Sequence, residues 1–126
     1  MRIITSYYDS ILKPSGLRIT QFTVLLSIGY KGSLSITDIA NLTDIDRTTL
    51  QRSLEILRKK GFLLIEKAKL GNLREVSLTT KGEKILEESI PLWKMAQSTI
   101  EKKIGKEKFA KNIALLGELK SLELEL

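Results

Sequence analysis

The positive charges of this chain are concentrated in one segment. Between Arg47 and Lys84 the sequence has ten Lys or Arg residues and four acids, so this segment carries the whole formal net charge of +6. The remainder has eleven residues of each sign and is neutral. A neutral body with one basic segment is the electrostatic pattern of a protein that binds a phosphate backbone. The simpler alternative is a solvated surface with lysines at helix ends.

The same segment contains side chains that can read bases. Arg can form two hydrogen bonds with guanine, Gln can do so with adenine, and Thr can contact the methyl group of thymine. The first residues of a helix in the major groove make such contacts, unless they are ordinary helix surface. We predict base contacts by Thr48, Gln51 and Arg52, base or phosphate contacts by Arg47 and Thr49, phosphate contacts by Ser35 and Thr37, and backbone contacts by Lys67, Lys69, Asn72 and Arg74.

Residue types that most enzymes and metal sites use are absent. The sequence has no Cys and no His. Thiol chemistry is therefore impossible, a zinc site is not expected, and general acid–base catalysis would have to proceed without His. No spacing indicates a carboxylate pair or a Ser–Lys pair. We expect no enzyme activity, no metal and no cofactor.

Composition predicts a single soluble domain. The chain has 126 residues, of which 42% are hydrophobic and 29% charged, which is ordinary for one globular domain. No apolar run approaches the roughly 20 residues that span a membrane. The first residues, MRIITSYYDSILKPSG, do not resemble a signal peptide. We expect a cytoplasmic protein without membrane contact.

Hydrophobic spacing predicts the elements that position the basic segment. Apolar residues three or four apart predict helices over 3–12, 36–42 and 47–60, and a further helix capped by Thr20. Ser35 is a suitable cap for the helix over 36–42, and Asp46 for the helix over 47–60. Gly61 is the expected stop of the helix over 47–60.

A hairpin and more helices follow. Residues 62–67 and 73–78 alternate as strands do, around a Gly71-Asn72 turn. Thr80 and Glu83 form a capping box for a long helix, and 106–122 is predicted as a last helix. The fold class is mainly α with a small β-hairpin wing: a winged helix-turn-helix with flanking dimerisation helices. We assign 1–126 to one domain, with 17–80 as the DNA-binding part and 1–14 and 81–126 as the dimerisation part.

The flanking helices have more apolar surface than a winged helix alone can cover. Surfaces of this kind usually mark an interface, although these helices could instead fold back onto their own domain. A two-fold dimer would place two recognition helices roughly 34 Å apart, one turn of DNA. The predicted dimer residues are Ile3, Ile4, Tyr7, Trp93, Ile100, Ile104, Phe109, Ile113, Leu116 and Leu119.

In order and spacing, several stretches resemble the MarR family of regulators. LKPSGLRITQFTVLLSI is similar to the family's join between the first dimerisation helix and the winged helix. LSITDIANLTDIDRTTLQRSLEILRKKGFL resembles its helix-turn-helix, and REVSLTTKGEKIL its second wing strand and long helix. IPLWKMAQ resembles a segment further along that helix. The wing departs from the family, because Asn72-x-Arg74 stands where members often have Asp-x-Arg in a longer loop.

The resemblance implies a homodimer that binds double-stranded DNA at a pseudo-palindromic operator, and repression that a ligand relieves. A small apolar or phenolic effector would lie in a crevice lined by aromatic residues, unless these are simply core. The aromatic candidates are Tyr7, Tyr8, Phe22, Tyr30 and Trp93. Without cysteine, a thiol switch is excluded.

The leading interpretation is a sequence-specific, dimeric transcriptional regulator that acts as a repressor. One alternative is an architectural protein that coats DNA with little sequence preference. Another is a winged helix used as a protein-interaction module, with its basic face on an acidic partner. The ratio of affinities for operator and random DNA distinguishes the sequence-specific regulator from the architectural protein. Absence of DNA affinity identifies the protein-interaction module.

Overall fold

A helical body supports a small three-stranded sheet in this protein. The computed structural model describes residues 2–67 and 74–104. The elements in chain order are α1 (Arg2–Leu12), the 3-10 turn η1 (Lys13–Ser15), α2 (Ile19–Lys31), β1 (Ser33–Ser35), α3 (Ile36–Thr43), α4 (Arg47–Lys59), β2 (Leu63–Lys67), β3 (Arg74–Leu78) and α5 (Thr80–Ile104). The expected class, mainly α with a small wing, is confirmed.

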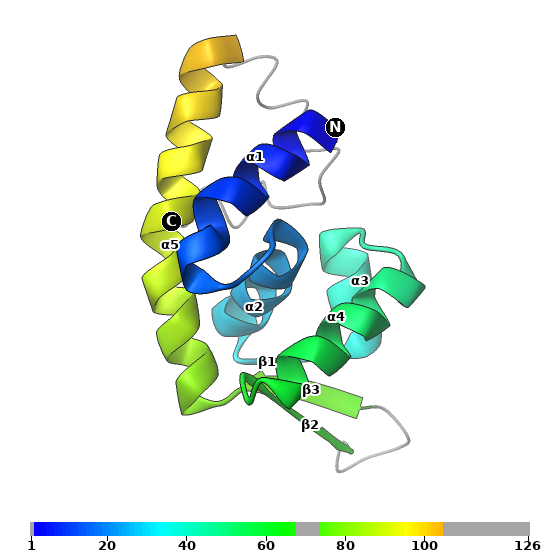
Figure 1. The fold of residues 1–126 in the computed structure, drawn as a ribbon. Coiled ribbons are helices and arrows are strands. Elements are labelled where there is room, and N and C mark those ends of the chain that lie inside the picture. Colours follow the sequence, from blue (N-terminus) through cyan, green and yellow to red (C-terminus); the bar gives the residue numbers. More distant parts are fainter. Residues whose placement is uncertain (1, 68–73, 105–126) are drawn as a thin grey trace.

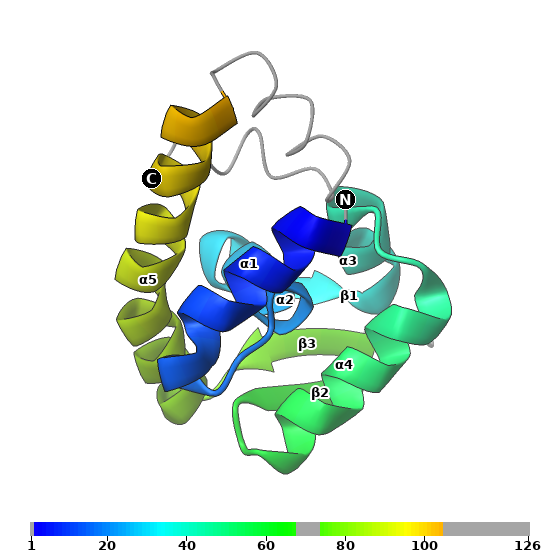
Figure 2. The same cartoon turned by 45° about the horizontal axis from the view of Figure 1, so that its top comes forward.

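Helix α2 occupies the centre of the molecule. In Figure 1, α5 runs along one side of α2, and α3 and α4 lie on the other side. Figure 2 shows α1 lying across α2 and toward α5. Every residue from 21 to 28 is buried. The hydroxyls of Thr23 and Ser27 donate to the carbonyls of Ile19 and Thr23, at 2.8 Å each, so their burial leaves no donor unsatisfied.

The hydrophobic core is continuous from α1 to α5. Phe22 of α2 stacks on Trp93 of α5, with ring centroids 5.6 Å apart. Leu57 of α4 and Val76 of β3 belong to the same core cluster and are fully buried. The helix-turn-helix therefore rests on the same apolar cluster as the long helix.

The sheet has one strand more than the sequence predicted. Its order is β1-β3-β2, with β3 antiparallel to both neighbours. β1 is only three residues long and comes directly after Gly32, whose φ is +92°. The sequence predicted only the strands over 62–67 and 73–78, and β1 was missed because three residues are too few to show an alternating pattern.

The start of α2 differs from the prediction. Thr20 was expected to cap this helix, but α2 begins at Ile19 and the expected cap is wrong. The Ile19 amide donates to Asp9 Oδ1 of α1 at 2.7 Å, and the Arg18 amide donates to Gln21 Oε1 at 3.1 Å. A carboxylate ten residues away therefore holds the beginning of the helix.

The start of α5 also differs by one residue. A capping box of Thr80 and Glu83 was predicted, but the hydroxyl that accepts from the first turn belongs to Thr79, at 3.0 Å from the Gly82 amide. Thr80 is exposed. The predicted Gly71-Asn72 turn and the predicted helix over 106–122 lie outside the described residues.

Candidate nucleic-acid interface

Helix α4 is fixed at its first turn by Asp46. The Thr49 amide donates to Asp46 Oδ2 at 3.0 Å, as expected for an N-cap. The hydrogen bonds from Thr49 lower the pKa of the Asp46 carboxyl, and the charge of Arg52 contributes less. The inner stripe of Leu50, Leu54 and Leu57 is buried. The opposite face of α4 therefore points away from the core.

That outer face carries the predicted base-reading residues. Arg47, Thr48, Gln51 and Arg52 are exposed, and Thr49 is half-buried. Arg47 and Gln51 lie one helical turn apart, and so do Thr48 and Arg52. These four side chains form two adjoining rows at the beginning of α4. In Figures 1 and 2, this end of α4 lies far from α5.

Helix α3 meets α4 through a tight turn. Asp44 adopts a left-handed conformation, with φ of 58°, and its amide donates to the Ala40 carbonyl at 2.9 Å. Thr43 is buried, and its hydroxyl donates to the Ile39 carbonyl at 2.7 Å. These bonds close the end of α3, and the chain turns from there into α4.

At the other end of α3, the two predicted phosphate contacts differ in their surroundings. The Ser35 hydroxyl accepts from the Asp38 amide at 3.0 Å, so Ser35 caps the helix. Thr37 is exposed, and its side chain has no hydrogen bond within the described part of the chain.

The wing places two cations opposite each other. Lys67 of β2 pairs in register with Arg74 of β3, and both side chains are exposed. Like charges directly opposite one another destabilise an antiparallel pair. Neither cation has an ion pair among the described residues. An anion at this end of the wing would relieve their repulsion, whereas Lys69 and Asn72 lie outside the described residues.

Some of the segment's cations bind the protein itself. Arg58 forms two hydrogen bonds with Glu55, at 2.6 and 3.1 Å, which raise the pKa of Arg58 and lower the pKa of Glu55. Lys60 Nζ donates to the Gly16 carbonyl at 3.4 Å, and Lys81 Nζ donates to the Lys60 carbonyl at 3.0 Å. The sequence could have indicated the Arg58–Glu55 pair, because side chains three residues apart on a helix are neighbours.

The predicted dimer residues divide into three groups. Trp93 and Ile100 are 1% and 7% exposed, so their side chains have almost no free surface within one chain. Ile4 and Tyr7 are half-buried on α1. The side chains of Ile3, Ile104, Phe109, Ile113, Leu116 and Leu119 lie outside what the structure describes.

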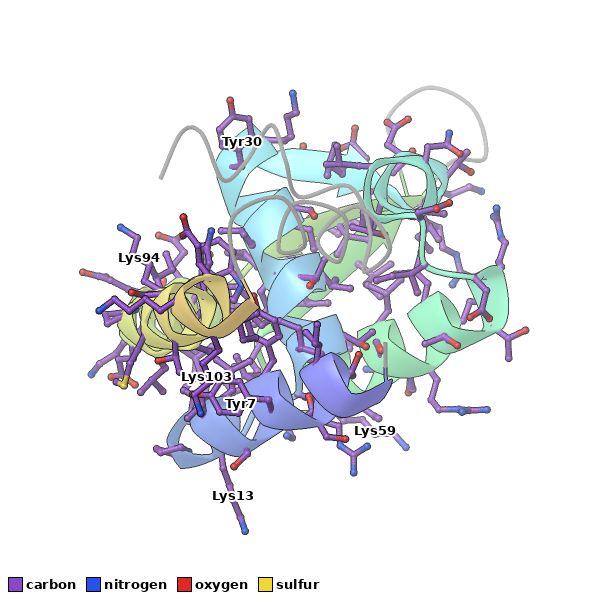
Figure 3. All side chains as sticks on the ribbon, turned by 90° about the horizontal axis from the view of Figure 1, so that it is seen from above. Tyr7, Lys13, Tyr30, Lys59, Lys94 and Lys103 are labelled. Atoms are coloured by element: carbon purple, nitrogen blue, oxygen red, sulfur yellow. The ribbon has the colours of Figure 1, made fainter. Side chains whose placement is uncertain are left out.

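The predicted aromatic crevice is not assembled as expected. Tyr8, Phe22 and Trp93 are core residues with at most 1% exposure. Tyr30 lies at the end of α2 and is 45% exposed. In Figure 3, Tyr30 and Tyr7 lie on opposite sides of the molecule. The five aromatic side chains therefore do not line one cavity.

Comparisons with known proteins agree with this geometry. A family model described as "MarR family" matches residues 15–68. The transcriptional regulator MosR of M. tuberculosis, solved in complex with DNA, is 30% identical with a TM-score of 0.79, covering 96% of this chain and 90% of that one.

More distant solved structures share the fold. A mutant MarR of E. coli complexed with operator DNA is 23% identical with a TM-score of 0.76, over 91% of this chain and 84% of that one. A MarR-family regulator of Rhodococcus sp. RHA1 is 14% identical with a TM-score of 0.76, over 90% of this chain and 81% of that one. A search of functionally curated proteins finds no match. In the described part of the chain, no helix is both long and apolar enough to span a bilayer.

Proposed function

The chain belongs to the MarR family of transcriptional regulators, and we propose that it acts as a homodimer that binds a pseudo-palindromic operator and represses transcription. The observation that carries this proposal is the outer face at the beginning of α4. There, Arg47, Thr48, Gln51 and Arg52 are exposed beside one another and have no ion pair within the described residues. The basic charge of the neighbouring wing favours the approach of DNA to this face.

In the proposed complex, the start of α4 lies in the major groove. Arg52 binds guanine and Gln51 binds adenine, each through two hydrogen bonds, and Thr48 contacts a thymine methyl group. Arg47 and Thr49 bind bases or phosphates. MosR, whose solved complex contains DNA, provides a precedent for DNA binding by a protein of this fold.

The remaining contacts position the protein on the backbone. Thr37 binds a phosphate at the start of α3, where the helix dipole favours an anion, and Ser35 contributes mainly through its cap. Lys67 and Arg74 bind phosphates along the wing, because their mutual repulsion in the free protein falls when an anion lies between them. Lys69 and Asn72 extend this contact.

Dimerisation is proposed through residues 1–14 and 81–126. Helix α5 is 25 residues long and extends past the helix-turn-helix, and α1 packs beside it. Ile4 and Tyr7 of α1 retain exposed apolar surface that a second chain can cover. Two copies related by a two-fold axis present two α4 helices to successive turns of one face of DNA.

The test is selection of bound sequences from random duplex DNA at about 150 mM salt. The proposal predicts an enriched palindromic motif with half-sites about one helical turn apart. Binding without an enriched motif would favour an architectural protein, and absence of binding would favour a protein-interaction module. Repression is then measured by placing the motif between a promoter and a reporter gene.

A further inference from the structure

A side chain of α5 covers the turn that ends α4. Lys81, in the first turn of α5, donates from Nζ to the Lys60 carbonyl oxygen at 3.0 Å. The same Nζ lies 5.5 Å from the centroid of the Phe62 ring, and a Cβ atom added at Gly61 would lie 3.7 Å from Lys81 Cδ. The Lys81 side chain therefore contacts three consecutive residues. In Figure 1, α5 begins beside this turn.

The ammonium group of Lys81 stands at the negative end of α4. Lys60 is the C-cap residue of α4, and a cation at this end of a helix is favoured by the dipole and by the last carbonyl groups. Arg58 and Lys59 also lie at this end, but they belong to α4 and move with it. Because Lys81 belongs to α5, its charge links the two helices.

The end of α4 is held from a second side. Lys60 Nζ donates at 3.4 Å to the carbonyl of Gly16, which lies between η1 and α2. α4 has 13 residues, so a tilt of about 5° at its end displaces its start by roughly 2 Å. Hydrogen bonds from Gln51 and Arg52 to base edges do not tolerate a displacement of this size. The fixed end therefore controls the position of the base-reading residues.

We propose that Lys81 is a positioning residue for sequence reading, which holds α4 at the angle of the DNA complex without touching DNA itself. This role rests on the proposed function. A binding orientation that is populated only part of the time lowers the apparent affinity by the same fraction. Base contacts need one orientation of α4, whereas phosphate contacts on random DNA accept several. Lys81 therefore acts on the ratio of the two affinities.

The DNA test compares three variants of the full chain. Lys81→Met keeps the length of the side chain and removes the ammonium group. It should lower affinity for the selected operator by about three- to tenfold and change affinity for random DNA by less than about twofold. Lys81→Arg keeps the charge and the ring contact and should bind as the natural chain does. Lys84→Met removes the same charge from the same turn and should leave the ratio unchanged. Lys84 is exposed, without a hydrogen bond or ion pair among the described residues.

Hydrogen exchange tests the contact in the free protein. The amides of Lys60 and Phe62 donate to the carbonyls of Ile56 and Leu57, at 3.0 Å each. Both amides should exchange faster in Lys81→Met than in Lys84→Met, because the end of α4 opens more often without its cation. Equal exchange in the two variants would show that Lys81 does not hold this end. The measurement needs no DNA and is independent of the proposed function.

Two results with DNA would overturn the positioning role. One is an equal ratio of operator to random affinity in Lys81→Met and Lys84→Met. The other is an equal loss on both DNAs in Lys81→Met with a salt slope smaller by about one, because that result assigns Lys81 to direct phosphate contact. A natural chain that selects no motif would instead contradict the proposed function, and faster exchange in Lys81→Met would still establish the contact with α4.

Discussion

The hydroxyl of Thr79 donates a hydrogen bond of 2.6 Å to the carbonyl oxygen of Gly61. The hydroxyl oxygen of Thr79 also accepts a hydrogen bond from the Gly82 amide at 3.0 Å. One side chain therefore caps α5 and ties it to the turn that ends α4. The Thr79 amide adds a bond of 3.0 Å to the Phe62 carbonyl. This junction fixes the angle between the proposed recognition helix and the long helix.

Removing the Thr79 hydroxyl should destabilise the protein. Thr79→Val keeps the shape of the side chain but leaves the Gly82 amide and the Gly61 carbonyl without this partner. We expect the free energy of unfolding to fall by about 1–3 kcal/mol, as measured by urea denaturation. Thr79→Ser retains the hydroxyl and should remain within about 0.5 kcal/mol of the natural chain. Equal stability of the two variants would show that the junction contributes nothing.

Gly82→Ala tests how closely α5 approaches the same turn. In the first turns of a helix, replacing Gly by Ala normally stabilises by roughly 0.5–1 kcal/mol. Here the added Cβ would lie 2.0 Å from the Phe62 carbonyl oxygen, which is backbone. We therefore expect destabilisation of about 1–3 kcal/mol in thermal or urea unfolding. A stabilising effect of the usual sign would mean that α5 can move away without cost.

The two arginines of α4 should differ in DNA binding. Arg52 is exposed and has no ion pair within the described residues, whereas Arg58 is held by Glu55. Arg52→Ala should weaken binding to the selected operator by about 1–3 kcal/mol and relax specificity at one base. Arg58→Ala removes the same charge and serves as the control, with a smaller loss that is uniform across sequences. Equal losses in a titration of both variants would argue against base contact by Arg52.

The cap of α4 makes stability depend on pH. Hydrogen bonds from Thr49 lower the Asp46 pKa below its ordinary value of 3.8. The pKa of the Asp46 carboxyl is therefore lower in the folded protein than in the unfolded chain. Its contribution to the free energy of unfolding is present above pH 3.8 and is lost as the pH falls through the pKa of the folded protein. The stability difference between the natural chain and Asp46→Ala should therefore shrink in urea denaturation from about pH 6 to about pH 2.

Asp46→Asn is the matched control for this titration. Asn caps a helix nearly as well as Asp but has no carboxyl group to protonate. Its advantage over Asp46→Ala should stay constant over the same pH range. A difference between the natural chain and Asp46→Ala that stays constant or grows toward low pH would contradict the role of the ionised cap.

Local patterns predicted much of the fold. The stripe of Leu50, Leu54 and Leu57 predicted a helix over 47–60, and the structure has α4 at Arg47–Lys59. Ser35 and Asp46 were predicted as caps, and both accept the expected amide hydrogen bonds. These predictions were correct because every group involved lies within four residues along the chain.

The errors came from partners that are distant in sequence. Judged by sequence alone, Thr79 and Thr80 were equally plausible caps. Thr79 is the cap in the structure, where its hydroxyl also bonds to the Gly61 carbonyl, 18 residues away along the chain. Thr20 was the wrong cap because Asp9, on another helix, binds the Ile19 amide. Apolar spacing also could not tell whether Trp93 faces a second chain or its own core. Its contact with Phe22 depends on how α2 and α5 cross.

The candidate site was predictable in type but not in detail. The excess of charge over 47–84 identified the basic segment, yet Arg58, Lys60 and Lys81 bind groups of the chain itself. Which cations remain available for phosphate depends on side-chain partners, and charge counting does not identify those partners.

The most direct test of the central claim is the spacing between half-sites in the selected operator. Inserting about five base pairs, half a helical turn, moves one half-site to the other face of the DNA, and about ten base pairs restore the face. A dimer with two α4 helices in successive major grooves predicts a loss of affinity of about 100-fold or more with the shorter insert. Unchanged affinity in a titration at about 150 mM salt would mean that each chain binds alone, which contradicts a dimeric regulator.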